Sequence, residues 1–469
     1  MHDESLAFES AAGAARRIRA GELSSVELTE LQLARIAAFD PELLAYVLVT
    51  AERALEDARR ADAAPRERRS SLHGVPIGLK DLFDTAGIVT AAGAKVLAGR
   101  VPDRDAAATE RMAAAGTVLL GKQNMHEFAY GLTTTNVHTG ATRNPWDRER
   151  VPGGSSGGTA AALAAGLCYL GLGSDTGGSI RLPAAACGIV GLKPTFGRVS
   201  RRGAWPLSWS LDHMGPMART VEDAALALEC LAGHDPEDPW SAREPAGGFA
   251  AELEAGAQGL RVGVPRNWFF DELQPEVGQA MEEAIATFAR LEARVTELEV
   301  PYLEHVYTAF HPIIAAEASA LHEPWLRTQP QDYGELTRRA LELGFALSAV
   351  DHVNARRMQS VLRAELAERM REIDVLLVPS APRTAPKIGE PISREPKEAW
   401  NRCLVPFNLT GQPAISVPAG FDGAGLPIGL QFAGRPFEEA TVLRAARAWE
   451  RETEWSARRP ELPAAPARR

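Results

Sequence analysis

The sequence has few cysteines and no long apolar run, and both shortages argue against whole classes of protein. Its 469 residues include only four cysteines, Cys168, Cys187, Cys230 and Cys403, and none are spaced as C-x-x-C. Such cysteines are typical of reduced thiols in the cytoplasm, not of a disulfide framework or a zinc site. No run of 18 apolar residues is present, and the start MHDESLAFES lacks the pattern of a secretion signal. We therefore expect a cytoplasmic protein without a membrane partner.

Positive charge is also scarce. The chain carries 51 lysines and arginines against 61 aspartates and glutamates, which gives a formal net charge of −10 at pH 7. A surface with this balance repels phosphate backbones, so we expect no direct nucleic-acid partner. The hydrophobic share of 45% is ordinary for a globular protein and permits a sizeable core.

Short apolar runs alternate with helical patterns over most of the chain. Residues 1–65 have helical spacing, with Ser24 or Ser25 as a helix cap, and residues 303–371 are also largely helical. Continuously apolar runs, typical of strands buried on both faces, occur at 74–80, 116–122, 168–175, 187–194, 260–265, 373–379, 413–418 and 426–434. The alternation predicts an α/β fold with a sheet covered by helices on both faces.

One apolar run partly matches a phosphate-binding loop. GTVLLGKQ (116–123) fits the pattern G-x-x-x-x-G-K, but Gln123 stands where a serine or threonine would bind magnesium. The residues between the glycines are apolar and partly β-branched, which favours a buried strand.

Two clusters of serine and glycine, GGSSG (153–157) and TGGSIR (176–181), carry the strongest chemical signal. The first fits the G-x-S-x-G pattern of a nucleophile elbow, yet the preceding RNPWDRERVP cannot be the buried strand that an elbow follows. Ten histidines are scattered, and none of His213, His234 and His322 has a context that marks it as a base. A Ser–His–Asp triad is therefore disfavoured.

The second cluster suits an oxyanion hole, because glycines free the backbone N–H groups from Thr176 through Ser179 to converge on one point. A serine nucleophile also needs a base, and lysine is a documented variant. Lys80 ends the apolar run GVPIGL and would be carried into the interior, where burial lowers its pKa.

Both features also have a purely structural explanation. Ser156 would cap the helix of TAAALAAG. On spacing alone, Lys80 would be a solvated lysine at the end of a strand. The residues by themselves leave these alternatives open.

Longer motifs resemble one family, the amidase signature enzymes. The similar segments are GVPIGLKDLFDTAG (74–87), GKQNMHEFAYG (121–131), RNPW (143–146), PGGSSGGTAAALAAG (152–166), GSDTGGSIRLPAAACGIVGLKPTFGRVSRRG (173–203), SLDHMGPMART (210–220) and PFNLTGQPAISVP (406–418). The resemblance implies the amidase signature fold, a large central mixed β-sheet between helices, with no metal and no cofactor. We expect a single domain over residues 1–469, made of N-terminal helices (1–65), a signature core (66–232), a variable and largely helical insertion (233–372) and the C-terminal part of the core (373–469).

The resemblance also assigns roles. The family's Ser–Ser–Lys triad maps onto Ser179 as nucleophile, Ser155 as a bridging serine with a cis peptide, and Lys80 as base. Asp175 and Arg181 are expected to brace the loop. The implied oxyanion hole consists of the N–H groups of Thr176, Gly177, Gly178 and Ser179. The implied reaction cleaves a carboxamide C–N bond through an acyl-enzyme and releases a carboxylate and ammonia or an amine.

Two branches of the family fit the sequence to different degrees. The glutaminase component of the tRNA-dependent Glu/Asp amidotransferase usually carries a stretch like SNLARYDGVRYG after an A-E-A-S segment. Here A-E-A-S is present at 316–319, but that stretch is absent. The glutaminase branch also has an aspartate where this chain has Asn401, although Arg338 and Arg339 resemble its RR segment. We expect a free-standing amide hydrolase, and the alternative is the glutaminase of that amidotransferase.

The substrate pocket is predicted from large side chains in or beside the signature segments. The candidate contacts are Met125, Phe128, Ser155, Trp205 and Trp400, with Tyr130 and Trp209 nearby in sequence. Each large side chain is as easily a core residue. We expect a small-molecule amide as the partner, with aryl or apolar carboxamides or anilides preferred over glutamine, and a homodimer is left open.

Overall fold

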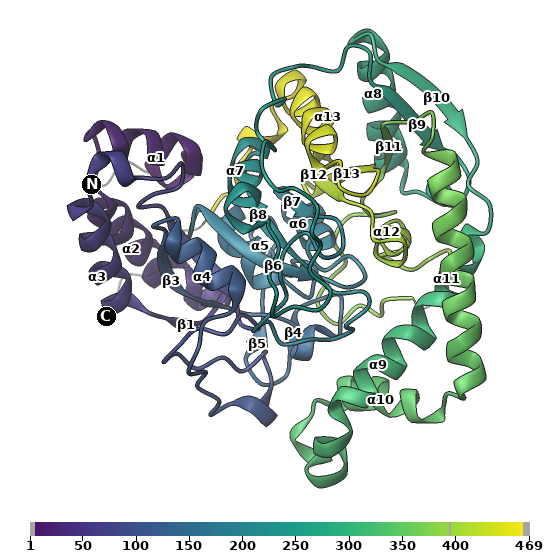
Figure 1. Ribbon diagram of the computed structural model, residues 1–469, viewed down its shortest axis with the longest axis horizontal. Helices are drawn as coiled ribbons and strands as arrows, with labels where there is room; N and C mark the ends of the chain where they lie inside the picture. Colours follow the sequence, from purple (N-terminus) through teal and green to yellow (C-terminus); the bar gives the residue numbers. More distant parts are fainter. Residues whose placement is uncertain (1–4, 394, 463–469) are drawn as a thin grey trace.

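The computed structural model describes residues 5–393 and 395–462, and its centre is one mixed β-sheet (Figure 1). Eleven strands of the described chain form this sheet in the order β1-β3-β2-β6-β8-β7-β12-β13-β11-β9-β10. The strands are β1 (Tyr46–Val49), β2 (Pro76–Lys80), β3 (Val118–Gln123), β6 (Leu170–Asp175), β7 (Val190–Lys193), β8 (His213–Ala218), β9 (Arg261–Pro265), β10 (Arg294–Leu298), β11 (Val375–Pro379), β12 (Ala414–Phe421) and β13 (Pro427–Gly434). A separate hairpin pairs β4 (Thr135–Asn136) with β5 (Gly140–Ala141).

Helices cover both faces of the sheet. On strand β13, Gly429 lies against Ala185 of one helix, whereas Gly434 lies against Val442 of another on the opposite face. The helices are α1 (Ala11–Ala20), α2 (Ser25–Leu43), α3 (Ala51–Ala63), α4 (Ala107–Ala114), α5 (Gly157–Ala164), α6 (Arg181–Cys187), α7 (Val221–Leu231), α8 (Pro275–Arg290), α9 (Val306–Thr328), α10 (Glu335–Leu343), α11 (Ala349–Arg369), α12 (Val405–Thr410) and α13 (Glu439–Glu452). The predicted α/β class and the large mixed sheet are confirmed. The division of the chain into four parts stays a prediction.

The predicted strands lie where the apolar runs placed them, and the prediction for the first 65 residues was partly wrong. Ser24 begins α2 with a capping box, in which its hydroxyl accepts the N–H of Glu27 and the Glu27 carboxylate accepts the N–H of Ser24. The short strand β1 then interrupts the helices and pairs antiparallel with β3. Four residues that change from buried at Tyr46 to exposed at Val49, without alternation, give too little periodicity to distinguish a strand from a helix end.

The parallel strands β3, β2 and β6 position Lys80 and Asp175. β2 lies between β3 and β6 and is parallel to both, so the carboxyl ends of all three meet at one edge of the sheet. Lys80 ends β2 and Asp175 ends β6. The carboxyl edge of parallel strands is where α/β folds commonly bind ligands.

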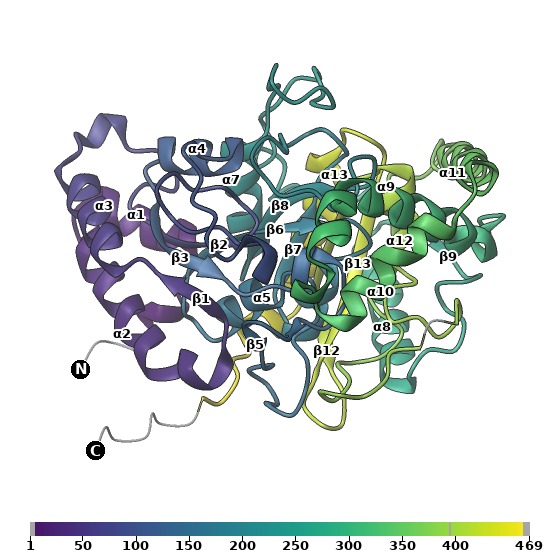
Figure 2. The ribbon, with the colours of Figure 1, turned by 90° about the horizontal axis from the view of Figure 1, so that it is seen from below.

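Helices α9, α10 and α11 form an arm on the opposite side of the molecule from α1, α2 and α3 (Figures 1 and 2). The arm packs on itself and on α12. Within the described residues, no helix is long and apolar enough to cross a bilayer, and no group of histidine, cysteine and acidic side chains is arranged to hold a metal ion.

Gly158 lies where α5 packs closely against neighbouring backbone. A Cβ atom at this position would lie 2.4 Å from the carbonyl oxygen of Asn124 and 2.6 Å from that of Ala45, and neither backbone atom can move freely. We expect Gly158→Ala to lower the free energy of unfolding by about 1–3 kcal/mol, as overpacking does. Urea unfolding followed by circular dichroism measures this change.

The matched control is Gly278→Ala near the start of α8, where the added methyl group meets open space. Alanine is the better helix former, so this variant should gain about 0.5–1 kcal/mol. Equal stability of the two variants would contradict the tight seating of α5.

Candidate active site

Lys80 is the last residue of β2 and is completely buried. Its Nζ donates to the hydroxyl of Ser155 at 2.6 Å and to the hydroxyl of Ser174 at 2.8 Å. The two acceptors come from the loop before α5 and from β6, so three segments of the core meet at this amine. The solvated lysine considered from the sequence is therefore not what the structure contains.

Burial lowers the pKa of Lys80 to about 7, from an ordinary value of 10.5. The carboxylates of Asp175 and Asp212 act in the opposite direction, because negative charge favours the protonated amine. A substantial fraction of Lys80 is consequently neutral near pH 7.

The loop before α5 approaches its neighbours too closely for side chains at its glycines. The Gly154–Ser155 peptide is cis, as the resemblance implied. A Cβ atom at Gly153 would lie 2.7 Å from Cα of Pro183, and one at Gly154 would lie 2.7 Å from the backbone nitrogen of Thr133. The glycines thus let the Ser155 backbone sit directly on two other segments.

Ser156 occupies the N-cap position of α5, but its hydroxyl makes no capping hydrogen bond. Instead Ser156 Oγ donates to the carbonyl oxygen of Ser174 at 3.3 Å. The backbone N–H of Ser156 donates to the carbonyl oxygen of Ser179, also at 3.3 Å. The two serine clusters, which are distant in sequence, are therefore in direct backbone contact.

Ser179 lies in the turn between β6 and α6, and a buried ion pair holds this turn. Arg181 donates through Nη2 and Nε to the two carboxylate oxygens of Asp175, at 2.9 and 3.0 Å. The same carboxylate accepts the N–H groups of Gly178 and Ile180. Burial alone would raise the pKa of Asp175, but the guanidinium of Arg181 holds it well below its ordinary value.

The geometry reduces the predicted set of oxyanion donors from four to three. The N–H of Gly178 already donates to Asp175 Oδ1 at 2.9 Å, so it is not free for a ligand. The N–H groups of Thr176, Gly177 and Ser179 have no hydrogen-bond acceptor among the residues that the structure describes. Gly178 has a φ of 115° and packs against Leu404, where a Cβ atom would be only 2.5 Å from Cδ1. Gly178 is therefore needed for the shape of the turn.

Several residues at the turn were not singled out as site residues from the sequence. Thr176 Oγ1 donates to Asp212 Oδ1 at 2.6 Å, and Asn401 Nδ2 donates to the carbonyl oxygen of Gly177 at 2.8 Å. Asn401 Oδ1 accepts the hydroxyl of Tyr307 at 2.9 Å, so both ends of this amide are engaged. Phe310 of α9 covers Gly177. Ser174 could have been found, because it lies just before Asp175 at the end of the predicted strand that leads into the GGS turn.

Phe128 and Trp205 lie together in an aromatic cluster near the Ser155 loop, and their contact with substrate stays a prediction. The ring centroid of Phe128 is 6.0 Å from Trp205, 4.3 Å from His322 and 5.6 Å from Tyr333. His126, two residues before Phe128, donates its N–H to the carbonyl oxygen of Ser155 at 3.1 Å. This hydrogen bond places the segment that carries Phe128 beside the Ser155 loop. Met125 is fully buried in the same core.

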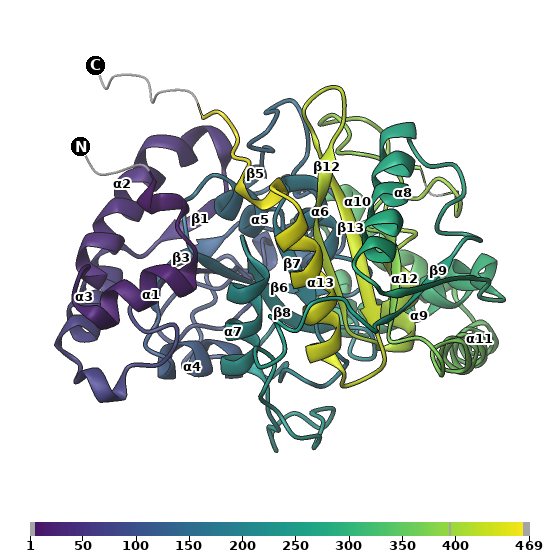
Figure 3. The ribbon, with the colours of Figure 1, turned by 90° about the horizontal axis from the view of Figure 1, so that it is seen from above.

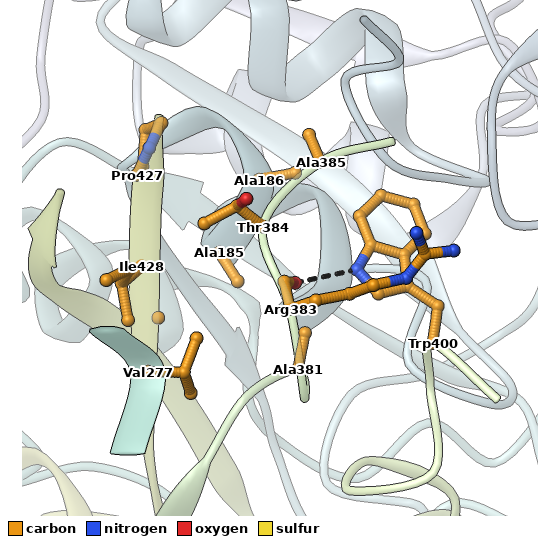
Figure 4. A pocket seen from close by; sticks show the side chains of 11 residues that line it. Ala185, Ala186, Val277, Ala381, Arg383, Thr384, Ala385, Trp400, Pro427 and Ile428 are labelled. Atoms are coloured by element: carbon orange, nitrogen blue, oxygen red, sulfur yellow. Dashed lines mark hydrogen bonds between the residues drawn. The ribbon is translucent and has the colours of Figure 1, made fainter. Parts of the chain in front are cut away.

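Trp400 lies apart from this cluster and packs as a core residue. Its side chain is fully buried, and its indole Nε1 donates to the carbonyl oxygen of Arg383 at 3.0 Å (Figure 4). The adjoining cavity, lined by Ala185, Ala381 and Ile428, has a volume of about 10 Å³. This space holds at most one water molecule.

Neither His126 nor His213 forms a hydrogen bond with the side chain of Ser155 or Ser179. Burial and the nearby Lys80 lower the pKa of His126 to about 4, so its ring is neutral. His213 is held by the carbonyl oxygens of Leu211 and Asp175. The titratable side chain that forms a hydrogen bond with the Ser155 hydroxyl is Lys80.

Comparison with known proteins agrees with these motifs. Residues 27–443 match the family model described as Amidase. The A component of the glutamyl-tRNA(Gln) amidotransferase of Chloroflexus aggregans is 44% identical, over 95% of this chain and 96% of its own length.

Two solved structures share the fold over nearly their whole length. A structure described as a vestigial protein complex that reveals the evolutionary origins of an s-triazine catabolic enzyme has a TM-score of 0.90 and 37% identity, covering 95% of this chain and 98% of that one. The 6-aminohexanoate cyclic dimer hydrolase has a TM-score of 0.89 and 31% identity, covering 97% and 99%. From the family match, the identities and the serine and lysine motifs, this chain belongs to the amidase signature family.

Proposed function

We propose that this protein hydrolyses carboxamide C–N bonds, with Ser179 as nucleophile, Ser155 as proton carrier and Lys80 as base. The observation that carries the proposal is the 2.6 Å hydrogen bond from the buried Lys80 amine to Ser155. An amine with a pKa of about 7 is neutral often enough near pH 7 to accept a proton.

The first half of the reaction forms an acyl-enzyme. Ser179 Oγ attacks the amide carbonyl carbon while its proton passes to Ser155 Oγ and the Ser155 proton passes to Lys80. The free N–H groups of Thr176, Gly177 and Ser179 stabilise the negative oxygen of the tetrahedral intermediate. The C–N bond then breaks, and the relay runs backwards to protonate the leaving amine or ammonia.

The second half releases the acid. A water molecule attacks the ester carbonyl and gives its proton to the same relay, which returns it to Ser179 Oγ as the C–O bond breaks. The Asp175–Arg181 ion pair takes no proton in either half, because Arg181 keeps the Asp175 carboxylate charged and holds the turn in place.

We propose aryl or apolar carboxamides or anilides as preferred substrates. The support is the cluster of Phe128 with Trp205 and Tyr333 beside the Ser155 loop, since aromatic faces bind flat apolar groups. Asn401 is neutral and both ends of its amide are engaged, so it offers no charge to a substrate ammonium group.

The alternative is the glutaminase of a tRNA-dependent Glu/Asp amidotransferase, which the 44% identity to a component of such an enzyme favours. Against it, Arg338 pairs with Glu342 and Arg339 with Glu335, all on α10. These arginines are therefore neutralised by their own helix and do not mark a carboxylate site for glutamine.

Removal of either end of the relay should abolish turnover without unfolding the protein. Ser179→Ala and Lys80→Met should each lower kcat by at least about 10³-fold, since members of one catalytic unit act together. A sulfonyl fluoride should form a covalent adduct that mass spectrometry locates on Ser179. The matched control is Ser156→Ala, which removes the adjacent hydroxyl outside the relay and should keep most activity. Near wild-type rates for Ser179→Ala or Lys80→Met would refute the mechanism.

Activity should rise with pH through an apparent pKa of about 7. Only neutral Lys80 accepts a proton, so kcat/KM falls about tenfold per pH unit well below pH 7 and is constant well above it. The measurement is kcat/KM from about pH 5 to 9, with circular dichroism at each pH to separate inactivation from unfolding. A rate that decreases with rising pH in a folded protein would contradict a lysine base.

A substrate panel should separate the free-standing amidase from the glutaminase. We expect the purified chain to hydrolyse an aryl carboxamide such as phenylacetamide with a kcat/KM at least about tenfold above that for glutamine. Phe128→Leu should lower the value for phenylacetamide but leave that for acetamide nearly unchanged. Glutamine as the best substrate, or ammonia release from glutamine that requires a co-purified partner, would favour the amidotransferase component.

A further inference from the structure

A second cavity lies at the C-terminal ends of α5 and α6, whereas the proposed catalytic serines lie near their N-terminal ends. Its volume is about 410 Å³, within the range of small-molecule sites. It is bordered by Ala164 at the end of α5 and by Cys187 and Gly188 at the end of α6. These two helices begin at Gly157 and Arg181, beside the serine clusters, so the cavity lies at their opposite ends.

The wall of the cavity is built from three distant parts of the chain. Phe8 precedes α1, Arg219 and Thr220 join β8 to α7, and the C-terminal segment after α13 supplies Arg458 and Arg459. Figure 3 shows this C-terminal segment crossing from α13 towards the N-terminal helices. The guanidinium of Arg459 lies 4.6 Å from the ring centroid of Phe8, which fixes the crossing.

Arg219 places a buried positive charge in this wall. It is only 8% exposed, its Nη1 donates to the carbonyl oxygen of Cys168 at 2.7 Å, and its Nη2 donates to that of Glu9 at 2.7 Å. Its Nε is buried without an acceptor. No described carboxylate forms an ion pair with Arg219, and these carbonyl oxygens together with the rings of Phe8 and Tyr169, 5.9 and 5.4 Å from its guanidinium, stabilise the charge. A buried donor without a partner costs free energy unless a ligand or water supplies the acceptor.

The rim of the cavity adds unpaired positive charge. Arg458 lies over Phe421 with 4.6 Å to the ring centroid, and neither Arg458 nor Arg459 has an ion pair among the described residues. The acidic lining residue Glu450 is already neutralised, because it pairs with Arg447 at 2.7 Å and accepts the N–H of Val221. The lining thus holds four arginines and two glutamates in a chain whose net charge is −10.

We propose that this cavity binds a small polyanion, a molecule with phosphate or clustered carboxylate oxygens, through Arg219, Arg458 and Arg459. The exposed guanidinium groups of Arg458 and Arg459 match both oxyanions with paired hydrogen bonds, whereas Arg219, whose Nη atoms already donate to carbonyl oxygens, adds positive charge from the wall. This site is separate from the proposed hydrolysis and does not depend on it.

Calorimetric titration of the full-length protein with pyrophosphate and, separately, with citrate tests the site. The ionic strength is held constant with sodium chloride, so that general screening does not differ between samples. We expect saturable binding of one ligand per chain, and the tighter of the two ligands identifies the anion class. Each arginine lost should weaken binding about tenfold, because hydrogen bonds to charged groups are strong.

The test variant is Arg458→Ser with Arg459→Ser, which removes two exposed side chains and leaves Arg219 and the core intact. The matched control is Arg327→Ser with Arg371→Ser, which removes the same charge from exposed positions at the end of α9 and just after α11. Loss of binding in the first pair but not in the control supports the site. Equal binding by both pairs, or no saturable binding by the unaltered protein, overturns it, whatever the amidase assays give.

Discussion

The burial of one amine is the constraint on which the proposed site depends. Lys80 ends a central strand flanked by two parallel neighbours, and water is excluded from it. Two carboxylates nearby would restore its proton if they acted alone. Arg181 counters one of them by binding Asp175 with two hydrogen bonds. The same ion pair therefore shapes the turn that holds Ser179 and limits the negative field at Lys80, which ties the geometry of the proposed site to its protonation.

Close backbone contact joins the two serine clusters. Glycines at 153, 154 and 178 all lie where a Cβ atom would meet another segment at 2.7 Å or less. Ser155 is thus held by packing, while Ser179 is held by the carboxylate of Asp175 through its neighbours. This division explains why the motif needs glycines on both sides of its serines. Gly153 and Gly154 permit the close approach of the Ser155 backbone to other segments. Gly178 permits a turn that leaves neighbouring N–H groups free.

The sequence predicted the buried strands and the meeting of Lys80 with Ser155, because apolar runs and long motifs report local structure well. It could not predict contacts that depend on distant segments. Gly178 was assigned to the oxyanion hole, yet its N–H is taken by Asp175. Trp400 was assigned to the pocket, yet its indole donates to the carbonyl of Arg383 in the core. Ser174 and Asn401 acquire their contacts only when β2 and residues after 400 fold against the turn.

The acceptors of Arg181 have a consequence for the order in which the protein is made. Arg181 donates to Leu404, Asn408 and Gln431, which follow it by 223 to 250 positions. A nascent chain of about 400 residues already contains Lys80, Ser155 and Ser179, but it lacks these acceptors. The proposed catalytic centre is therefore complete only when the last strands leave the ribosome, and a prematurely terminated chain carries the proposed catalytic side chains without the acceptors that hold Arg181.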